Sequence, residues 1–233
     1  MSESELLSAV EIETGSNPAH TILWMHGLGA DGNDFVPIIN ELTVSSKIPI
    51  RFIFPHAPER PVTINGGYVM RAWYDIYGAN IGASEDETGI RASQKNIDAL
   101  IENELRRGIA STHIVLAGFS QGGAMALQAG LRQKNKLGGI MALSCYLPLS
   151  ASLHHEAQAI NTATPIFMAH GTYDAIVPIT LATSSKEKLL QAHYTVDWHE
   201  YSIEHSVCSQ EIDDIDQWLQ QIIFQGSSIC HSL

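Results

Sequence analysis

One serine lies in a pattern that could make it a nucleophile. Residues 118–122 read Gly-Phe-Ser-Gln-Gly, the pattern G-x-S-x-G that places a serine on a sharp turn between a strand and a helix. The apolar run 113–117 precedes this turn, and apolar residues at helical spacing follow it. Glycines at its two ends leave room where a Cβ would collide with neighbouring backbone. The pattern therefore predicts that Ser120 attacks a carbonyl carbon and forms an acyl-enzyme.

A serine hydroxyl needs a base, and the base needs an acid that fixes its tautomer. In folds with this turn the three residues follow in the order serine, acid, histidine. Asp174 comes after the apolar run 165–169, and His205 comes after the run 194–201. Of the 11 histidines, His205 alone has this order and position, and His170 is better explained as a structural residue. The sequence therefore predicts Asp174 as the orienting acid and His205 as the general base.

The attack would create an oxyanion that N–H groups must stabilise. Residues 26–29 read His-Gly-Leu-Gly directly after the apolar run 21–25, and a glycine-rich loop in this position supplies one donor. The residue after the nucleophile supplies the other. We therefore predict the backbone N–H groups of Leu28 and Gln121 as the donors, and their side chains need not take part. His26 is expected to form a structural hydrogen bond within the loop.

Short apolar runs that alternate with helical patterns must position these residues. The predicted strands are 21–25, 51–54, 113–117, 139–143, 165–169 and 194–201. The predicted helices are 34–42, 87–107, 121–133, 180–192 and 212–223. This alternation predicts a doubly wound and mostly parallel sheet with helices on both faces. Together with the turn at Ser120 and the order of its partners, it indicates an α/β-hydrolase fold. We expect one domain over residues 1–224 with a minimal lid, a flexible tail over 225–233, the last strand near the sheet edge, and an irregular segment over 55–82.

Composition excludes several classes of function. The 233 residues carry 13 Lys+Arg and 25 Asp+Glu, so the net charge is −12. An acidic surface repels phosphate groups, which argues against nucleic-acid binding and against attachment to anionic membranes by charge. No apolar stretch approaches the roughly 18 residues of a membrane-spanning helix. No metal motif such as H-E-x-x-H is present, and the predicted chemistry needs no metal or cofactor.

The three cysteines, Cys145, Cys208 and Cys230, are too scattered for a disulfide framework or a metal motif. Free thiols suit a reducing compartment, and residues 1–15 lack the features of a secretory signal, so we expect a cytoplasmic protein. Cys230 is four residues from the end, where a C-a-a-X box has its prenylated cysteine. The two residues after it are not aliphatic and no polybasic run precedes it, which favours an ordinary tail.

Longer motifs point to a known family. They read LWMHGLGADGNDF, FPHAPERPVTINGGYVMRAWYDI, EDETGIRAS, GFSQGGAMAL, LSCYLP, HGTYDAIVP and EHSVCSQEIDDIDQWL. With them the chain resembles, from about Thr21 to Leu219, the small carboxylesterases related to acyl-protein thioesterases, grouped as the phospholipase/carboxylesterase family. The resemblance implies the same three catalytic residues and the same two donors. It also implies that Trp73 borders an acyl-binding groove with Leu28 and Val177, with core packing as an equal alternative for Trp73.

The resemblance narrows the function to acyl hydrolysis. The first hypothesis is a carboxylesterase that cleaves carboxylic acyl esters through an acyl-enzyme. An acyl-protein thioesterase or a lysophospholipase, which acts on longer acyl chains, is the alternative, and a catalytically inactive binding protein is the third. Family members are often homodimers, so we expect a monomer or a homodimer. The loop reads GLGADG where the family usually has GLGDxG, which displaces Asp31 by one position.

Overall fold

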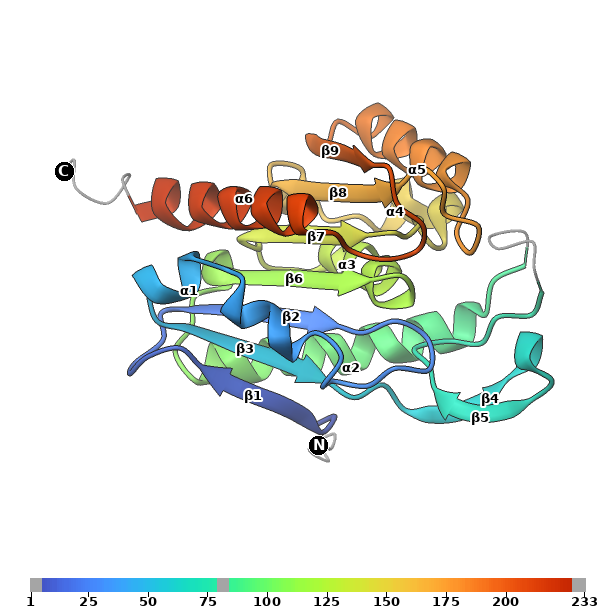
Figure 1. Ribbon diagram of the computed structural model, residues 1–233, viewed down its shortest axis with the longest axis horizontal. Helices are drawn as coiled ribbons and strands as arrows, with labels where there is room; N and C mark the ends of the chain where they lie inside the picture. The colour runs from blue at the N-terminus through green and yellow to red at the C-terminus, as the bar shows by residue number, and fades with distance from the viewer. Residues whose placement is uncertain (1–5, 79–83, 228–233) are drawn as a thin grey trace.

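The computed structural model describes residues 6–78 and 84–227. Its centre is a seven-stranded sheet with the order β1-β3-β2-β6-β7-β8-β9 (Figure 1). The strands are β1 (Ala9–Glu13), β2 (His20–Met25), β3 (Ile50–Pro55), β6 (Ile114–Phe119), β7 (Gly139–Leu143), β8 (Ile166–Gly171) and β9 (Val196–Tyr201). β1 runs antiparallel to β3, and the other pairs in this sheet are parallel. The mostly parallel sheet is therefore confirmed, and β9 lies at an edge as predicted.

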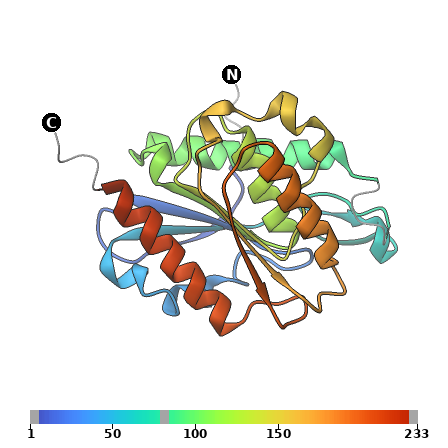
Figure 2. The ribbon, with the colours of Figure 1, turned by 90° about the horizontal axis from the view of Figure 1, so that it is seen from above.

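Helices cover both faces of this sheet, as the alternation of patterns predicted. The α-helices are α1 (Val44–Lys47), α2 (Glu87–Arg106), α3 (Gln121–Arg132), α4 (Leu153–Glu156), α5 (Ile179–Gln191) and α6 (Ser209–Ser227). The 3-10 helices are η1 (Val36–Asn40), η2 (Thr63–Asn65), η3 (Ser111–His113), η4 (Ser150–Ser152) and η5 (Ala159–Asn161). Figure 2 shows α1 and α6 on one side of the sheet and α2 and α3 on the other.

Each face of the sheet is buried in its own apolar core. Successive residues of a strand point to opposite faces, so Ile22 and Trp24 of β2 enter the core beneath α6, while Leu23 and Met25 enter the core beneath α2 and α3. This burial on both sides explains why the central strands are apolar throughout. The predicted site residues lie in the loops that follow the carboxyl ends of β2, β6, β8 and β9.

The segment predicted to be irregular contains a hairpin. Strands β4 (Glu59–Val62) and β5 (Tyr68–Arg71) pair antiparallel within residues 55–82, so that prediction was wrong in part. Each strand has only four residues, Pro61 lies within β4, and Gly66 and Gly67 form the turn with positive φ. Proline and glycine at this density are typical of loops, so the sequence did not indicate that the two strands pair.

Two further elements differ from the predictions. Residues 34–42 do not form an α-helix, because η1 spans only Val36–Asn40 and its turns close between residues three apart, as from the Ile38 N–H to the Phe35 carbonyl. Pro37 at its start and its five-residue length favour this tighter form. Strand β1 was not predicted, since it is a half-exposed edge strand with two glutamates among its five residues.

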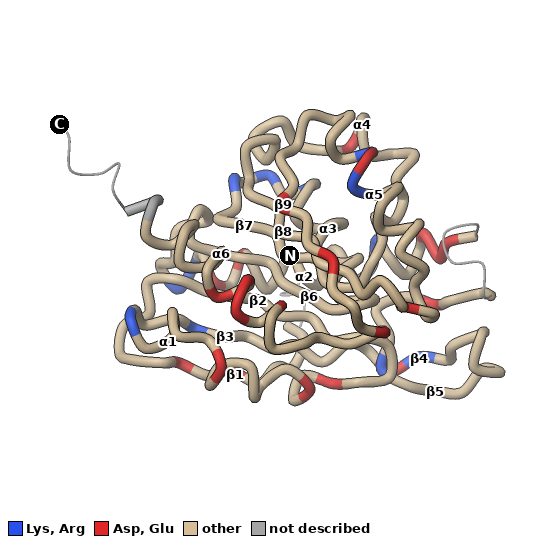
Figure 3. The backbone as a smooth tube through the Cα atoms, turned by 45° about the horizontal axis from the view of Figure 1, so that its top comes forward, with Lys and Arg blue, Asp and Glu red and all other residues tan. Residues whose placement is uncertain are grey.

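The last helix is longer than predicted. α6 continues to Ser227, past the boundary expected at residue 224, while residues 228–233, with Cys230 and the C-a-a-X position, lie outside the described residues. Acidic residues are spread over many elements rather than gathered on one of them (Figure 3). None of the described helices is long and apolar enough to span a bilayer.

Candidate active site

The turn between β6 and α3 holds Ser120 in a strained conformation. Its φ of 55° and ψ of −120° are rare for a residue with a side chain. A Cβ on Gly118 would lie 2.3 Å from the main-chain carbon of Gly122, and a Cβ on Gly122 would lie 2.2 Å from the Met25 oxygen. The two glycines therefore allow strand, turn and helix to approach one another, as the motif predicted.

The predicted residues Ser120, Asp174 and His205 meet at the carboxyl ends of the parallel strands. His205 Nε2 lies 2.9 Å from Ser120 Oγ, and His205 Nδ1 lies 2.6 Å from Asp174 Oδ2. The Asp174 carboxylate can only accept a hydrogen bond, so His205 Nδ1 carries the hydrogen and donates it, and Nε2 presents its lone pair to the serine. This arrangement can remove a proton from the Ser120 hydroxyl.

Burial differs between the acid and the base. The Asp174 side chain is fully buried and its Oδ1 accepts hydrogen bonds of 2.8 Å from the backbone N–H groups of Ile176 and Val177. Hydrogen bonds of this kind stabilise a carboxylate in its charged form. The His205 side chain keeps 16% of its surface exposed and packs its ring against Phe119, with 4.8 Å between the ring centroids. The acid is therefore fixed, whereas the base borders solvent.

Backbone hydrogen bonds join the loops that carry these two residues. The N–H of Thr172 donates to the carbonyl of Tyr201, and the N–H of Tyr173 donates to the carbonyl of Ile203. A Cβ on Gly171 would lie 2.3 Å from the carbonyl oxygen of Glu204, so the loops are in direct contact there. The parallel pairing of β8 with β9 is thus extended by the loops and brings Asp174 beside His205.

The two predicted oxyanion donors lie on either side of the turn. Leu28 follows β2 in a loop whose Gly27 would place a Cβ only 3.5 Å from the Ser120 Cβ. Gln121 is the first residue of α3, where a helix leaves its N–H groups without partners inside the helix. Within the described residues, neither the Leu28 N–H nor the Gln121 N–H donates to a protein acceptor. Both are available to a ligand oxygen.

Two histidines near the site have structural contacts. His26 and His170 are 2% and 1% exposed, and burial lowers the pKa of each below its usual value. His26 hydrogen-bonds the Gly27 carbonyl, as expected for its loop, and His170 Nε2 hydrogen-bonds the Val177 carbonyl at 2.8 Å. Both are therefore neutral groups that support the loops around the site.

The family model for Phospholipase/Carboxylesterase matches residues 7–223. The chain belongs to this family. Acyl-protein thioesterase 1 of Yarrowia lipolytica is 36% identical, over 92% of this chain and 97% of that protein. Acyl-protein thioesterase 1 of Neurospora crassa is 40% identical, over 86% of each chain.

Solved structures agree with this assignment. Arabidopsis thaliana SOBER1 aligns with a TM-score of 0.83 and 32% identity, over 88% of this chain and 99% of that chain. Zea mays acyl-protein thioesterase 2 aligns with a TM-score of 0.80 and 26% identity, over 93% and 100%. The protein is therefore a hydrolase with the α/β-hydrolase fold.

Two residues that the family resemblance assigned to an acyl groove are buried here. Trp73 is 0% exposed and Val177 is 4% exposed, and both side chains belong to the core beneath α2 and α3. Their place at the border of an acyl groove stays a prediction. Trp73 packs within the core, which agrees with the alternative expected from the sequence for this residue. The displaced Asp31 accepts a 2.7 Å hydrogen bond from the Asn33 N–H, which shapes the same loop.

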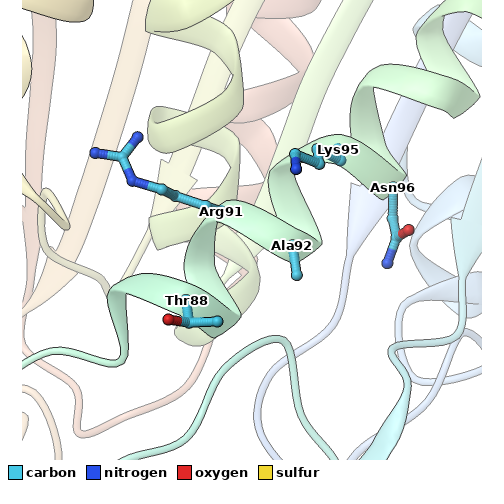
Figure 4. Close-up of a pocket in the computed structure, with 5 residues that line it drawn as sticks. All are labelled: Thr88, Arg91, Ala92, Lys95 and Asn96. Atoms are coloured by element: carbon cyan, nitrogen blue, oxygen red, sulfur yellow. The ribbon is translucent and has the colours of Figure 1, made fainter.

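Other candidate groups lie away from this chemistry. Cys145 is buried, and burial raises the pKa of its thiol, which disfavours the thiolate; Cys208 is half-buried before α6. Among the described residues, no group of three or more His, Cys, Asp or Glu side chains is arranged to hold a metal ion. An open depression of about 710 Å³ on the outer side of α2 is lined by Thr88, Arg91, Ala92, Lys95 and Asn96 (Figure 4). It contains none of the predicted site residues.

Proposed function

We propose that this protein hydrolyses carboxylic acyl esters and thioesters through an acyl-enzyme on Ser120. The observation that carries the proposal is the continuous hydrogen-bonded line from Asp174 through His205 to Ser120, at 2.6 Å and 2.9 Å. A serine is a weak nucleophile unless a base this close accepts its proton. Membership of a family of hydrolases supports the same chemistry.

In the proposed mechanism His205 Nε2 takes the hydroxyl proton while Ser120 Oγ attacks the carbonyl carbon. The N–H groups of Leu28 and Gln121 stabilise the oxyanion of the tetrahedral intermediate. When the intermediate collapses, His205 gives its proton to the departing alkoxide or thiolate, and the acyl group remains on Ser120. His205 then takes a proton from a water molecule that attacks the acyl-enzyme, and it returns this proton to Ser120 Oγ as the carboxylic acid leaves. Asp174 holds the imidazolium in place through its hydrogen bond to Nδ1.

The relatives favour one substrate class. The fungal proteins at 36% and 40% identity are acyl-protein thioesterases, which supports S-acylated protein as the substrate of this chain. Hydrolysis of small acyl esters uses the same residues and is the alternative, because both substrates pass through the same acyl-enzyme. Cytoplasmic location and a monomeric or homodimeric state stay predictions from the sequence.

Labelling by a fluorophosphonate probe tests the nucleophile. Wild-type protein and the control Ser184→Ala, which changes an exposed serine on α5, are expected to be labelled equally. Ser120→Ala is expected to lose labelling and hydrolysis together. A wild type that is not labelled would support the inactive binding protein, and a labelled Ser120→Ala would show that another residue is the nucleophile.

A substrate series tests the acyl preference. The kcat/KM for p-nitrophenyl esters of increasing chain length is measured beside that for a peptide with a palmitoylated cysteine. Acyl-protein thioesterase activity predicts that the thioester peptide is cleaved at least as fast as the best ester and that long chains are preferred. Activity on short esters without cleavage of the peptide would instead establish the carboxylesterase.

A further inference from the structure

Three buried side chains connect the two segments that carry the proposed oxyanion donors. His26, Trp73 and Gln121 are 2%, 0% and 3% exposed. The Gln121 side chain accepts a 2.7 Å hydrogen bond from the Trp73 N–H on Oε1 and donates a 2.7 Å hydrogen bond from Nε2 to the Tyr74 carbonyl. The start of α3 is thereby attached to the segment after β5 through a residue whose own N–H is the proposed donor.

Trp73 attaches the same segment to the other donor loop. Its indole Nε1–H donates a 2.9 Å hydrogen bond to the carbonyl of His26, directly before the Gly27–Leu28 peptide. Its own carbonyl accepts a hydrogen bond from the Ser93 hydroxyl on α2. Trp73 therefore binds Gln121 through its main-chain N–H and binds the loop after β2 through its indole N–H. The hydrogen bond from Ser93 attaches Trp73 itself to α2.

His26 sets the direction of the first donor. The Ala57 N–H donates a 3.0 Å hydrogen bond to His26 Nε2, so this nitrogen carries no proton and Nδ1 is the donor. Nδ1 in turn donates to the Gly27 carbonyl at 2.7 Å. The Gly27 carbonyl and the Leu28 N–H belong to one planar peptide group and point in opposite directions. Holding the carbonyl therefore aims the Leu28 N–H the other way.

We infer that His26, Trp73 and Gln121 form a clamp that sets the separation and direction of the two oxyanion donors before substrate binds. They act as positioning residues, since none of their side chains is placed to touch the reacting atoms. The inference rests on the proposed function, because the donors matter only if Ser120 attacks a carbonyl. Fixed donors accelerate the reaction because they need no reorganisation when the charge develops.

Gln121→Met tests the attachment to α3. Methionine keeps the length of the side chain and the backbone N–H of residue 121 but removes both hydrogen bonds. We expect kcat to fall about 10- to 100-fold, less than the 10²–10³ for loss of a whole donor, with KM nearly unchanged. The matched control is Gln128→Met on the same helix, which removes a buried glutamine bonded to Gln94 and is expected to keep kcat.

Trp73→Phe tests the attachment to the loop. The main-chain N–H and an aromatic ring remain, but the indole donor to the His26 carbonyl is lost and the smaller phenyl ring leaves a cavity in the core. Its matched control is Trp24→Phe, because Trp24 is equally buried and its Nε1 has no hydrogen-bond partner among the described residues. We expect a several-fold lower kcat for Trp73→Phe and an unchanged kcat for Trp24→Phe, which also controls for any general loss of packing.

A trifluoromethyl ketone separates positioning from general stability. Ser120 Oγ attacks the carbonyl carbon of this probe and gives its proton to His205, so the probe binds as a hemiketal oxyanion. Its affinity is therefore expected to fall in parallel with kcat/KM in Gln121→Met and Trp73→Phe, and to stay constant in Gln128→Met and Trp24→Phe. His26→Asn, whose amide can still donate to the Gly27 carbonyl, is expected to keep more activity than His26→Leu.

If the two clamp variants match their controls in kcat and in ketone affinity while wild type remains active, the clamp is wrong and the proposed function stands. If wild type neither hydrolyses acyl esters and thioesters nor binds the ketone, the proposed function itself fails.

Discussion

The two halves of the candidate site are built differently. The oxyanion half comprises the loop 26–30 with Trp73 and Gln121, and every side-chain nitrogen and oxygen of His26, Trp73 and Gln121 has a hydrogen-bond partner. The acid–base half comprises residues 170–177 and 202–211. There, within the described residues, the buried atoms His170 Nδ1 and Glu211 Oε1 have no partner.

The difference follows from what each half must do. An oxyanion hole works through dipoles that are fixed before the reaction, so complete hydrogen bonding suits it. A general base must accept and return a proton beside bound water and substrate, and its surroundings include groups with shifted pKa values. Burial raises the pKa of Glu211 to about 8, and it lowers the pKa of His170 as it does that of His26 in the oxyanion half. What separates the halves is hydrogen bonding, which is complete in the oxyanion half and incomplete in the acid–base half.

Asp174→Asn is the strongest test of the acid–base half. The amide can no longer hold the charged imidazolium, and it favours the wrong tautomer of His205, so we expect kcat to fall about 10⁴-fold. Asp197→Asn is the control, because Asp197 also pairs with a histidine, His199 at 3.0 Å, but lies exposed on β9. Equal kcat in both variants would show that the 2.6 Å contact to His205 is not part of the mechanism.

Gly122→Ala tests the rigidity of the oxyanion half. A Cβ there would meet the Met25 oxygen at 2.2 Å and the His26 oxygen at 2.6 Å, so the donor loop must move away from α3. We expect kcat to fall about 10²-fold or more, in the range for a lost oxyanion donor. Gly138→Ala is the control. It creates a similar clash, 2.6 Å from the Thr112 oxygen, but at the amino end of β7 and so at the opposite ends of the strands from the site.

Thermal melting and kcat are measured for Gly122→Ala and Gly138→Ala. Both alanine variants are expected to lose about 1 to 3 kcal/mol of stability from crowding. Only Gly122→Ala is expected to lose activity. A Gly122→Ala protein with normal kcat would show that the donor loop tolerates displacement, and the contrast between the halves would then disappear.

Glu211→Gln tests the cost of the buried carboxyl group in the acid–base half, whose Oε1 has no hydrogen-bond partner within the described residues. Because the folded-state pKa is raised to about 8 from an ordinary value of 4.5, the folded protein loses stability as the pH rises through that interval, and the loss is complete above pH 8. Glutamine does not ionise. We expect Glu211→Gln to match wild type near pH 4.5 and to be about 1 to 3 kcal/mol more stable above pH 8.

Chemical unfolding at several pH values measures this difference. Asp213→Asn, an exposed position in the first turns of the same helix, is the control and is expected to show no such dependence on pH. A stability difference for Glu211→Gln that does not change between pH 4.5 and 8 would mean that Glu211 is ionised throughout.

Much of the fold could be predicted from local patterns. The central strands are apolar because both faces are buried, and α6 shows an apolar stripe because only one side meets the sheet. The hairpin β4–β5 was not predicted, because its pairing depends on two four-residue strands with a proline and a two-glycine turn rather than on any periodic pattern. The edge strand β1 was not predicted either, because it is half-exposed and two of its five residues are glutamates.

The sequence by itself determined the family, the parallel sheet and the candidate residues Ser120, Asp174 and His205. The sharp turn around Ser120 is a local property of its flanking glycines, and the other two residues follow strands whose order the fold constrains. Only the tertiary structure decided the roles of the Gln121 and Trp73 side chains. Their hydrogen bond joins positions 48 residues apart, and one partner is a main-chain N–H. A main-chain donor has no residue type, so no sequence pattern marks it.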